Sequence, residues 1–248
     1  MKKVISKSTV RNLAHNLGKQ FLRAVGAFQS KHSKIPNTPF LPNDTFSCTS
    51  LLENHWKLIR DEFEAIWLEP QDIPSFHQIS PDQSRISKGE NWKTFAFYIF
   101  GSPVEENCKT CPETVRVLSQ IEGLQNAWFS ILAPGYKVPP HRGPTKALVR
   151  CHLGLRIPII EEKCWIRVGD EIRYWSEGRC MLFDDTYEHE VENGTAEYRA
   201  VLFIDLDRPM DRLGSTFNRL LLSMIQASHY VKEPLANLSE WNKNLKRK

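Results

Sequence analysis

Short apolar runs separated by turn-forming residues dominate the chain between residues 126 and 207. The strand-like runs cover 128–132, 147–157, 164–168, 172–175, 179–183, 188–192 and 199–205, and Gly, Pro, Asp and Asn lie between them. A further strand is predicted at 92–100, and residues 168–171 (VGDE) predict a hairpin turn. This many short strands at regular spacing predicts a mainly β domain with flanking helices, either a sandwich or a jelly-roll barrel.

Helical periodicity marks other stretches. Apolar residues recur at helical spacing within 1–34, over 51–67 and over about 215–230, and a short helix is predicted at 112–120. The last long helix is predicted to turn one set of side chains toward the core: Phe217, Leu220, Leu221, Met224, Ile225 and Ala227. Residues 243–248 are basic and predicted to be frayed. Residues 70–91 have no periodicity, and a loop of this length predicts a lid or a binding loop.

The N-terminal segment has an unusual charge. Residues 1–34 contain eight Lys or Arg residues and no acidic residue, on a helix with an apolar stripe. Such a helix either lies in an anionic membrane surface or packs its stripe on the domain, and a cleaved transit peptide has the same composition. Apolar runs fall short of the ~20 residues that span a bilayer. We therefore expect a cytoplasmic location, with peripheral contact to the inner face of the membrane through residues 1–34 as an open alternative.

A proline-punctuated linker at 34–42 divides the chain. We predict an N-terminal segment and linker over 1–46, a β domain over 47–210, and a C-terminal helix and basic tail over 211–248 that pack on the domain. The composition, 41% hydrophobic and 25% charged, is that of a protein with a packed core. Its basic residues cluster at the termini without an aromatic stacking face, so no nucleic-acid partner is expected.

Two histidines are candidates for metal binding. His141 and His189 lie at strand–loop boundaries, and neutral imidazoles suit a divalent transition metal. The facial triad of many oxygenases reads H-x-D…H, but Gly143 occupies its carboxylate position here. Asp184 and Asp185 fill the gap, terminate a strand, or orient His189; all three interpretations stay open.

Basic side chains are also predicted inside the barrel. Strand alternation over 148–156 places Arg150, His152 and Arg156 on one face, and Arg199 opens an apolar strand. Buried cations require a partner. They imply a small ligand that carries a carboxylate.

Three segments together resemble the aspartyl/asparaginyl β-hydroxylases among the Fe(II)/2-oxoglutarate dioxygenases: 140–145 (PHRGPT), 150–155 (RCHLGL) and 183–191 (FDDTYEHEV). The resemblance covers roughly residues 50–210. It implies a double-stranded β-helix (jelly roll, cupin-like) that uses Fe(II), 2-oxoglutarate and O2. It also implies a two-histidine iron site without a carboxylate ligand, which is consistent with Gly143. By position, His141 and His189 are similar to the iron ligands and Arg199 to the partner of the distal 2-oxoglutarate carboxylate; Ser130, Arg150 and His152 are similar to further cosubstrate contacts.

The irregular segment carries a finer resemblance. Residues 72–83 (DIPSFHQISPDQ) and 91–95 (NWKTF) are similar to the bacterial branch that contains lipid A acyl-chain hydroxylases. This favours hydroxylation of an unactivated C–H bond on a membrane lipid acyl chain, with residues 1–34 as an interfacial anchor. Hydroxylation of Asp or Asn in a peptide is the alternative within the enzyme class. A non-catalytic barrel that binds a carboxylate is the alternative outside it.

Overall fold

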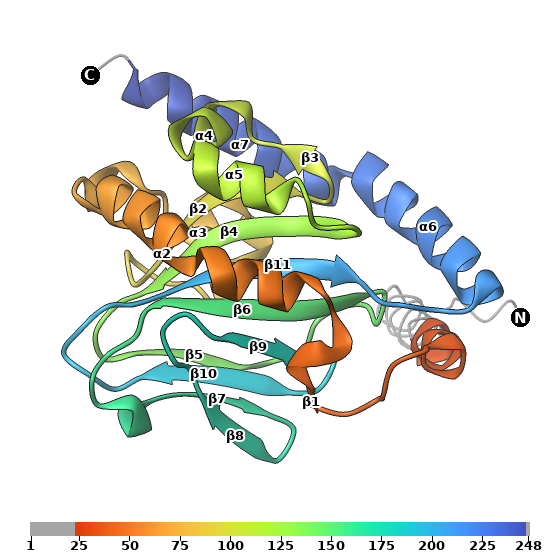
Figure 1. The fold of residues 1–248 in the computed structure, drawn as a ribbon. Helices are drawn as coiled ribbons and strands as arrows, with labels where there is room; N and C mark the ends of the chain where they lie inside the picture. Colours follow the sequence, from red (N-terminus) through yellow and green to blue (C-terminus); the bar gives the residue numbers. More distant parts are fainter. Residues whose placement is uncertain (1–22, 247–248) are drawn as a thin grey trace, which may run out of the picture.

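Two antiparallel sheets form the centre of the molecule. The structure, a computed structural model, describes residues 23–246. The larger sheet has the strand order β1-β9-β6-β11-β4-β2-β3 and the smaller has the order β5-β10-β7-β8. Figure 1 shows the smaller sheet below the larger one, with the helices above and in front. This architecture confirms the predicted mainly β fold with flanking helices, a cupin-like double-stranded β-helix.

The strands follow the predicted runs closely. Their bounds are β1 (Phe40–Leu41), β2 (Trp92–Ile99), β3 (Ser102–Pro103), β4 (Leu124–Leu132), β5 (Tyr136–His141), β6 (Leu148–Arg156), β7 (Cys164–Val168), β8 (Glu171–Tyr174), β9 (Cys180–Phe183), β10 (His189–Asn193) and β11 (Arg199–Asp207). The hairpin predicted at 168–171 joins β7 to β8, with Gly169 at φ 60°.

The described residues form four apolar clusters, of which the two largest lie on the two sides of the larger sheet. Leu132, Val138, Ile166 and Val201 belong to the cluster that joins the two sheets. The outer face of the larger sheet packs against α2 (Cys48–Trp67) and α5 (Pro112–Leu118), which follows α4 (Glu105–Thr110). On α2 the side chains of Leu52, Ile59 and Phe63 are fully buried at helical spacing, which confirms the amphipathic helix predicted there.

Strand β5 was missed by the sequence pattern, although it carries His141. Its sequence contains Pro139 and Pro140, which lack the N–H that a strand needs toward a neighbour. The structure resolves the conflict by placing β5 at the edge of the smaller sheet, where it pairs only with β10.

The prediction of Arg156 on the same interior face as Arg150 and His152 is wrong. The pairing of β6 with β11 shifts register between Ala200 and Val201. Beyond this irregularity the guanidinium of Arg156 donates to Glu64 of α2, outside the barrel interior.

The C-terminal region also differs from the prediction. One helix was predicted at about 215–230, but the chain forms α6 (Arg212–Ala227) and α7 (His229–Leu245), which an extended Ser228 separates. The prediction that Leu220 and Met224 face the core is wrong, because both are 62% exposed. The buried face of α6 is set by Asn218, whose amide donates to the carbonyl of Ala147 and accepts from Gln29. Residues 243–245 were predicted to be frayed and are instead the last residues of α7.

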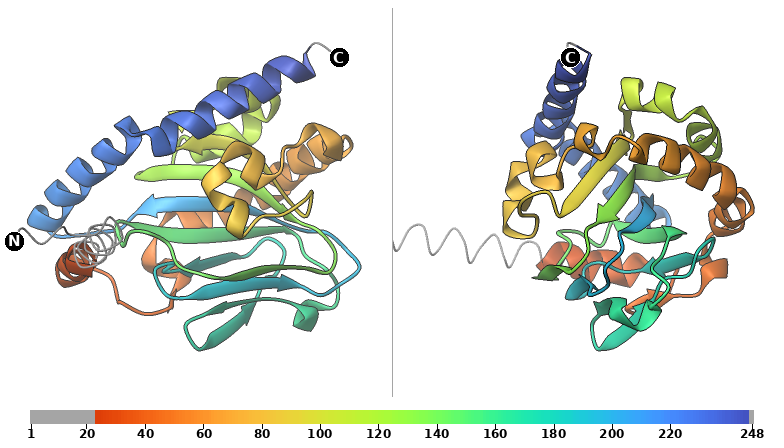
Figure 2. Two further views of the ribbon diagram at one scale, coloured as in Figure 1. Left: turned by 180° about the vertical axis from the view of Figure 1, so that it is seen from behind. Right: turned by 90° about the vertical axis from the view of Figure 1, so that its left-hand side faces the viewer.

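The start of the described chain packs beside α6. Residues 23–32 are helical, and the Phe28 and Phe217 rings lie 4.8 Å apart. Figure 2 shows this helix and α6 at the same end of the molecule. Most of the basic helix predicted in residues 1–34 lies outside the described residues. No helix within residues 23–246 is long and apolar enough to cross a bilayer.

Candidate active site

The two candidate metal ligands face each other across neighbouring strands. His141 on β5 and His189 on β10 are register partners, and their ring centroids are 4.0 Å apart. The Nδ1 atoms bond to the carbonyl oxygens of Pro139 at 2.8 Å and Tyr187 at 3.0 Å. A carbonyl only accepts, so each Nδ1 carries the proton and each Nε2 keeps a free lone pair.

The protonation state of the pair suits a metal. Burial lowers the pKa of His141 to about 4 and that of His189 to about 3. Both rings are therefore neutral near pH 7, and their Nε2 atoms are competent ligands for a divalent transition metal. Within the described residues, no group of three His, Cys, Asp or Glu side chains could hold a metal ion. The histidine pair therefore has no third His, Cys, Asp or Glu placed to share a metal ion with it in the described residues.

A carboxylate nevertheless fills the place of the missing third ligand. A Cβ atom on Gly143 would lie 2.2 Å from Oδ2 of Asp185, and the Gly143 N–H donates to the Asp185 carbonyl at 2.7 Å. The Asp185 carboxylate also accepts from Nη2 of Arg150 at 2.9 Å. Its burial raises the pKa of Asp185 to about 6. Asp185, in the loop between β9 and β10, therefore lines the same cavity as His141, and any larger residue at 143 would have to displace its carboxylate.

Asp184 has a different role from Asp185. It is fully buried and accepts from Lys146 Nζ at 2.5 Å and from Arg208 Nη2 at 2.6 Å. Burial opposes its ionisation, but these two cations outweigh burial and lower the pKa of Asp184. The ionised Asp184 also accepts from the Thr186 hydroxyl. It thereby fixes the loop that leads to His189.

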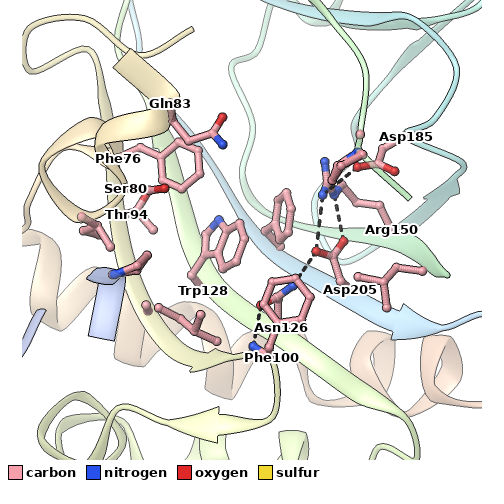
Figure 3. Close-up of a pocket in the computed structure, with 18 of the residues that line it drawn as sticks. Phe76, Ser80, Gln83, Thr94, Phe100, Asn126, Trp128, Arg150, Asp185 and Asp205 are labelled. Carbon is pink, nitrogen blue, oxygen red and sulfur yellow. Dashed lines mark hydrogen bonds and ion pairs between the residues drawn. The ribbon is translucent and has the colours of Figure 1, made fainter. Parts of the chain in front are cut away.

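Arg150 is already paired on two sides. Its Nε donates to Asp205 at 2.9 Å, and Asp205 in turn accepts from Asn126 at 2.9 Å (Figure 3). Burial alone would lower the pKa of Arg150, but the carboxylates of Asp185 and Asp205 raise it. The bonds that Arg150 makes use Nε and Nη2, which leaves Nη1 for a ligand.

Arg199 and His152 each have one buried nitrogen without a hydrogen-bond partner. These atoms are Nε of Arg199 and Nε2 of His152. The Trp175 indole N–H donates to Nδ1 of His152 at 3.3 Å, so the His152 proton lies on the unpaired Nε2. Within residues 23–246 no carboxylate forms an ion pair with Arg199, and burial lowers its pKa to about 10. Two unpaired buried donors fit an anion such as a carboxylate.

Ser130 lies next to Arg199. Nη1 of Arg199 approaches the Ser130 carbonyl at 3.4 Å, and the Ser130 hydroxyl accepts from the indole N–H of Trp92 at 3.0 Å. The structure therefore brings Ser130, Arg199 and His152 together on the inner face of the larger sheet. The same sheet carries Arg150 at the side nearer to the histidine pair.

An apolar cavity opens beside His141. Its walls come from the lid segment 70–91, from strands β2, β4 and β11, and from α7. The Trp128 and Phe203 rings both line the cavity and stack with their centroids 3.9 Å apart, and we call this pair its floor; Trp128 is labelled in Figure 3. The lid segment contains α3 (Phe76–Ile79) and contributes Phe76, Ile79, Ser80, Gln83 and Ile86.

Several lining residues were missed by sequence reasoning. Strand alternation inward from Ser130 reaches Trp128, and alternation from Arg199 reaches Phe203 and Asp205. Strand alternation could therefore have identified Trp128, Phe203 and Asp205 from the sequence. Tyr230 and Pro234 of α7 also line the cavity, and the sequence has no pattern that would place them there.

The chain matches a family model described as aspartyl/asparaginyl beta-hydroxylase over residues 53–209. It is 38% identical over 213 residues to an ornithine lipid ester-linked acyl 2-hydroxylase of Rhizobium tropici, covering 86% of this chain and 76% of that protein. It is 37% identical to aspartate beta-hydroxylase domain-containing protein 2 of Rattus norvegicus, covering 71% of this chain and 52% of that protein.

A third relative is the aspartyl/asparaginyl beta-hydroxylase of Mus musculus, at 35% identity, covering 64% of this chain and 21% of that protein. Among solved structures, the cupin domain of Schizosaccharomyces pombe Cnp3 aligns with a TM-score of 0.30 at 12% identity, over 37% of this chain and 57% of that one. His141, His189 and Arg199 all lie within the segment that the family model matches.

Proposed function

Because the chain belongs to the aspartyl/asparaginyl β-hydroxylase family, we propose that it is an Fe(II)- and 2-oxoglutarate-dependent dioxygenase that hydroxylates a C–H bond of a membrane-lipid acyl chain. The observation that carries the substrate class is the apolar cavity beside His141. Apart from Arg142 at its rim, the cation that lines this cavity within the described residues is Arg150, which two aspartates already neutralise.

The iron would be held by Nε2 of His141 and of His189. Their Nδ1–carbonyl bonds fix both ring orientations, and their low pKa values keep them neutral. When bound, iron with 2-oxoglutarate and O2 supplies the oxidant that converts C–H to C–OH while 2-oxoglutarate becomes succinate and CO2. Asp185 lines the same cavity as His141, and its carboxylate would accept a hydrogen bond from a water molecule there.

The cosubstrate would bind on the inner face of the larger sheet. Its distal carboxylate would pair with Arg199, whose Nε lacks a partner, and Ser130 would contribute a hydroxyl. His152 would donate from Nε2, and Arg150 from Nη1. A dicarboxylate satisfies all of these donors, whereas a neutral ligand would leave the Arg199 charge buried and uncompensated.

The acyl chain would lie on the Trp128–Phe203 floor. Leu148 and the residues Phe76 and Ile79 of segment 70–91 line the same cavity, so an acyl chain would contact apolar side chains on several sides. A peptide aspartate would instead bring another carboxylate into a cavity that Asp185 and Asp205 already line, both of them paired with Arg150. The R. tropici relative named for acyl 2-hydroxylation supports the lipid class, and lipid A remains one candidate lipid.

The expected location follows the substrate. We propose that the protein acts at the cytoplasmic face of the membrane and that residues 1–34, acid-free and basic, contribute peripheral contact. Cell fractionation with and without a carbonate wash tests this: release into the soluble fraction is expected for a peripheral protein, and retention in the membrane pellet would contradict it.

The decisive experiment combines turnover with product identification. Full-length protein is supplied anaerobically with Fe(II), then with 2-oxoglutarate, O2 and a total polar lipid extract. We expect succinate formation and a lipid acyl chain that gains one oxygen atom. His141→Ala should abolish both, whereas His229→Ala, at an exposed surface histidine, serves as the matched control. A parallel reaction replaces the lipid with a peptide that contains Asp and Asn. Oxygen gained by the peptide alone would establish the peptide alternative, and bound 2-oxoglutarate without succinate formation would establish the non-catalytic barrel.

A further inference from the structure

The outer face of α6 carries three large apolar side chains that no described element covers. Leu213, Leu220 and Met224 are 69%, 62% and 62% exposed. Their spacing of seven and four residues places them in one stripe along the helix. Single exposed apolar side chains are ordinary on protein surfaces, but an aligned set on one helix indicates an interaction surface. We call these three residues the α6 face.

The charged residues of α6 and of the adjoining helical residues 23–32 are all basic. Helix α6 contains Arg212 and Arg219 and no Asp or Glu, and the adjoining helical residues 23–32 contain Arg23 and Lys31 and no acidic residue. Asp211 precedes α6, but its carboxylate is occupied by the Gly214 N–H and by His32. An apolar stripe with basic borders is typical of a helix that lies in the interface of an anionic membrane.

Helix α6 is linked to the substrate cavity by two connections, one through its buried side and one at its C-terminal end. Gln29 of the neighbouring helix bonds to Asn218 of α6 and also to Thr145, which lines the cavity. At the other end of α6, the helix ends at Ala227, and Tyr230, close behind it in the sequence, also lines the cavity. Figure 2 shows α6 running along one side of the molecule toward α7.

We propose that the α6 face docks onto the surface of an anionic lipid bilayer, with Arg212 and Arg219 at the headgroups. Docking there would bring the cavity rim at Thr145 and Tyr230 close to the bilayer. The substrate part of this inference rests on the proposed function, but the docking itself requires no turnover. A second copy of the chain is a poorer occupant, because a two-fold contact through α6 would bring the same arginines of both copies together.

The test is co-sedimentation of the full-length protein with vesicles. One set contains phosphatidylglycerol and phosphatidylethanolamine, and the other contains phosphatidylcholine alone. We expect the anionic vesicles to bind the protein, and the triple variant L213S/L220S/M224S to weaken that binding by about tenfold or more. R212Q/R219Q should weaken binding to the anionic set and reduce its salt dependence. The matched control is Leu68→Ser/Ile159→Ser, at apolar side chains that are 80% and 88% exposed elsewhere.

Three results would overturn the inference. The first is vesicle binding by the triple variant equal to that of the control. The second is a lowered melting temperature of the triple variant, because that would show that the α6 face is covered within the chain. The third is a dimer in sedimentation velocity that the triple variant dissociates while vesicle binding stays unchanged.

The docking surface and the proposed function can be tested independently of each other. The α6 face lies outside the histidine pair and the cavity lining, so the triple variant should keep wild-type succinate formation on lipid dispersed in detergent. Vesicle binding without turnover by the wild type would retain the docking surface and remove the proposed function. Turnover by the wild type, with vesicle binding that does not depend on the α6 face, would retain the proposed function and remove the docking surface.

Discussion

The carboxylate of Asp185 occupies the space into which a side chain at residue 143 would extend. The separation between a Cβ on Gly143 and Oδ2 of Asp185 would be 2.2 Å, well inside van der Waals contact. A chain with aspartate at 143 therefore could not keep Asp185 in its present position, and the two carboxylates exclude each other. The position of Asp185, in the loop that precedes His189, therefore explains why residue 143 does not carry a carboxylate.

The first prediction follows from this exclusion. Gly143→Ala should displace Asp185, break its 2.9 Å pair with Arg150 and destabilise the fold by about 1–3 kcal/mol. Chemical denaturation and Fe(II) titration measure the two effects, and we expect weaker iron binding as well. Gly26→Ala is the matched control, because nothing lies within 4 Å of a Cβ at that position. Wild-type stability and iron affinity in Gly143→Ala would refute the account of residue 143.

A second prediction concerns the buried charge of Arg199. Arg199→Met removes a buried guanidinium whose Nε has no hydrogen-bond partner and whose charge has no carboxylate beside it in the described residues, so it should stabilise the ligand-free protein by about 1–3 kcal/mol. The wild type should gain about 2.7 kcal/mol with 2-oxoglutarate at a hundred times its Kd, whereas the variant should gain none. Thermal melts with and without 2-oxoglutarate measure both changes. Arg173→Met, at a half-exposed residue of β8, is the control, and an equal ligand response in wild type and Arg199→Met would exclude Arg199 from the cosubstrate site.

The third prediction is a pH dependence of the metal-free protein. The folded-state pKa values of His141 and His189, about 4 and about 3, lie below the ordinary value of 6.5. Below pH 6.5 the two imidazoles become protonated in the unfolded chain but stay neutral in the folded protein. The free energy of unfolding should therefore fall as the pH decreases from about 6.5 toward 4. Asp185 has a raised pKa of about 6 in the folded protein, so below pH 6 its protonation favours the folded state and partly offsets this loss of stability.

Urea denaturation between pH 7.5 and 4.5 tests this dependence. The variant H141N/H189N should lose most of the decline, because it lacks the two groups whose protonation differs between the folded and unfolded states. H55N/H229N is a control with two histidines away from the site, His55 half-buried on α2 and His229 exposed at the start of α7. An unchanged slope in H141N/H189N would assign the acid sensitivity to other groups.

The strand pattern was predictable where alternation and turn residues agree. The run predicted at 164–168 coincides with β7, and the neighbouring runs differ from their strands by only a few residues. Strand β5 was not predictable by the same signal, because its two prolines oppose a strand and are tolerated only at a sheet edge. Edge position is a tertiary property that a local pattern does not contain.

The candidate site was predictable in composition but only partly in arrangement. Alternation identified Arg150 and His152 as inward-facing residues, and the structure places them there, but a register shift moved Arg156 to α2. The contribution of Tyr230 depends on how α7 packs over the lid segment, where the Trp241 indole N–H donates to the Asp72 carbonyl. No periodicity in either segment encodes that contact.

The last prediction concerns the floor of the cavity. Trp128 stacks on Phe203 at 3.9 Å with an interplanar angle of 16°. Trp128→Ala should cost about 3 kcal/mol of stability and widen the cavity beside His141. A loosely held acyl chain would present its target C–H bond less often, so succinate should form without an equal amount of hydroxylated lipid. Trp128→Phe, which keeps a ring on Phe203, should retain most of the coupling.

The measurement is the ratio of hydroxylated lipid to succinate at saturating 2-oxoglutarate. Trp165→Ala is the matched control, because this tryptophan lies on β7 beside Lys137 and does not line the cavity. We expect the ratio to fall several-fold in Trp128→Ala and to stay near the wild-type value in Trp128→Phe and Trp165→Ala. Because the ratio is independent of the amount of folded enzyme, a loss of stability alone cannot lower it. Full coupling in Trp128→Ala would show that the substrate does not lie on this floor.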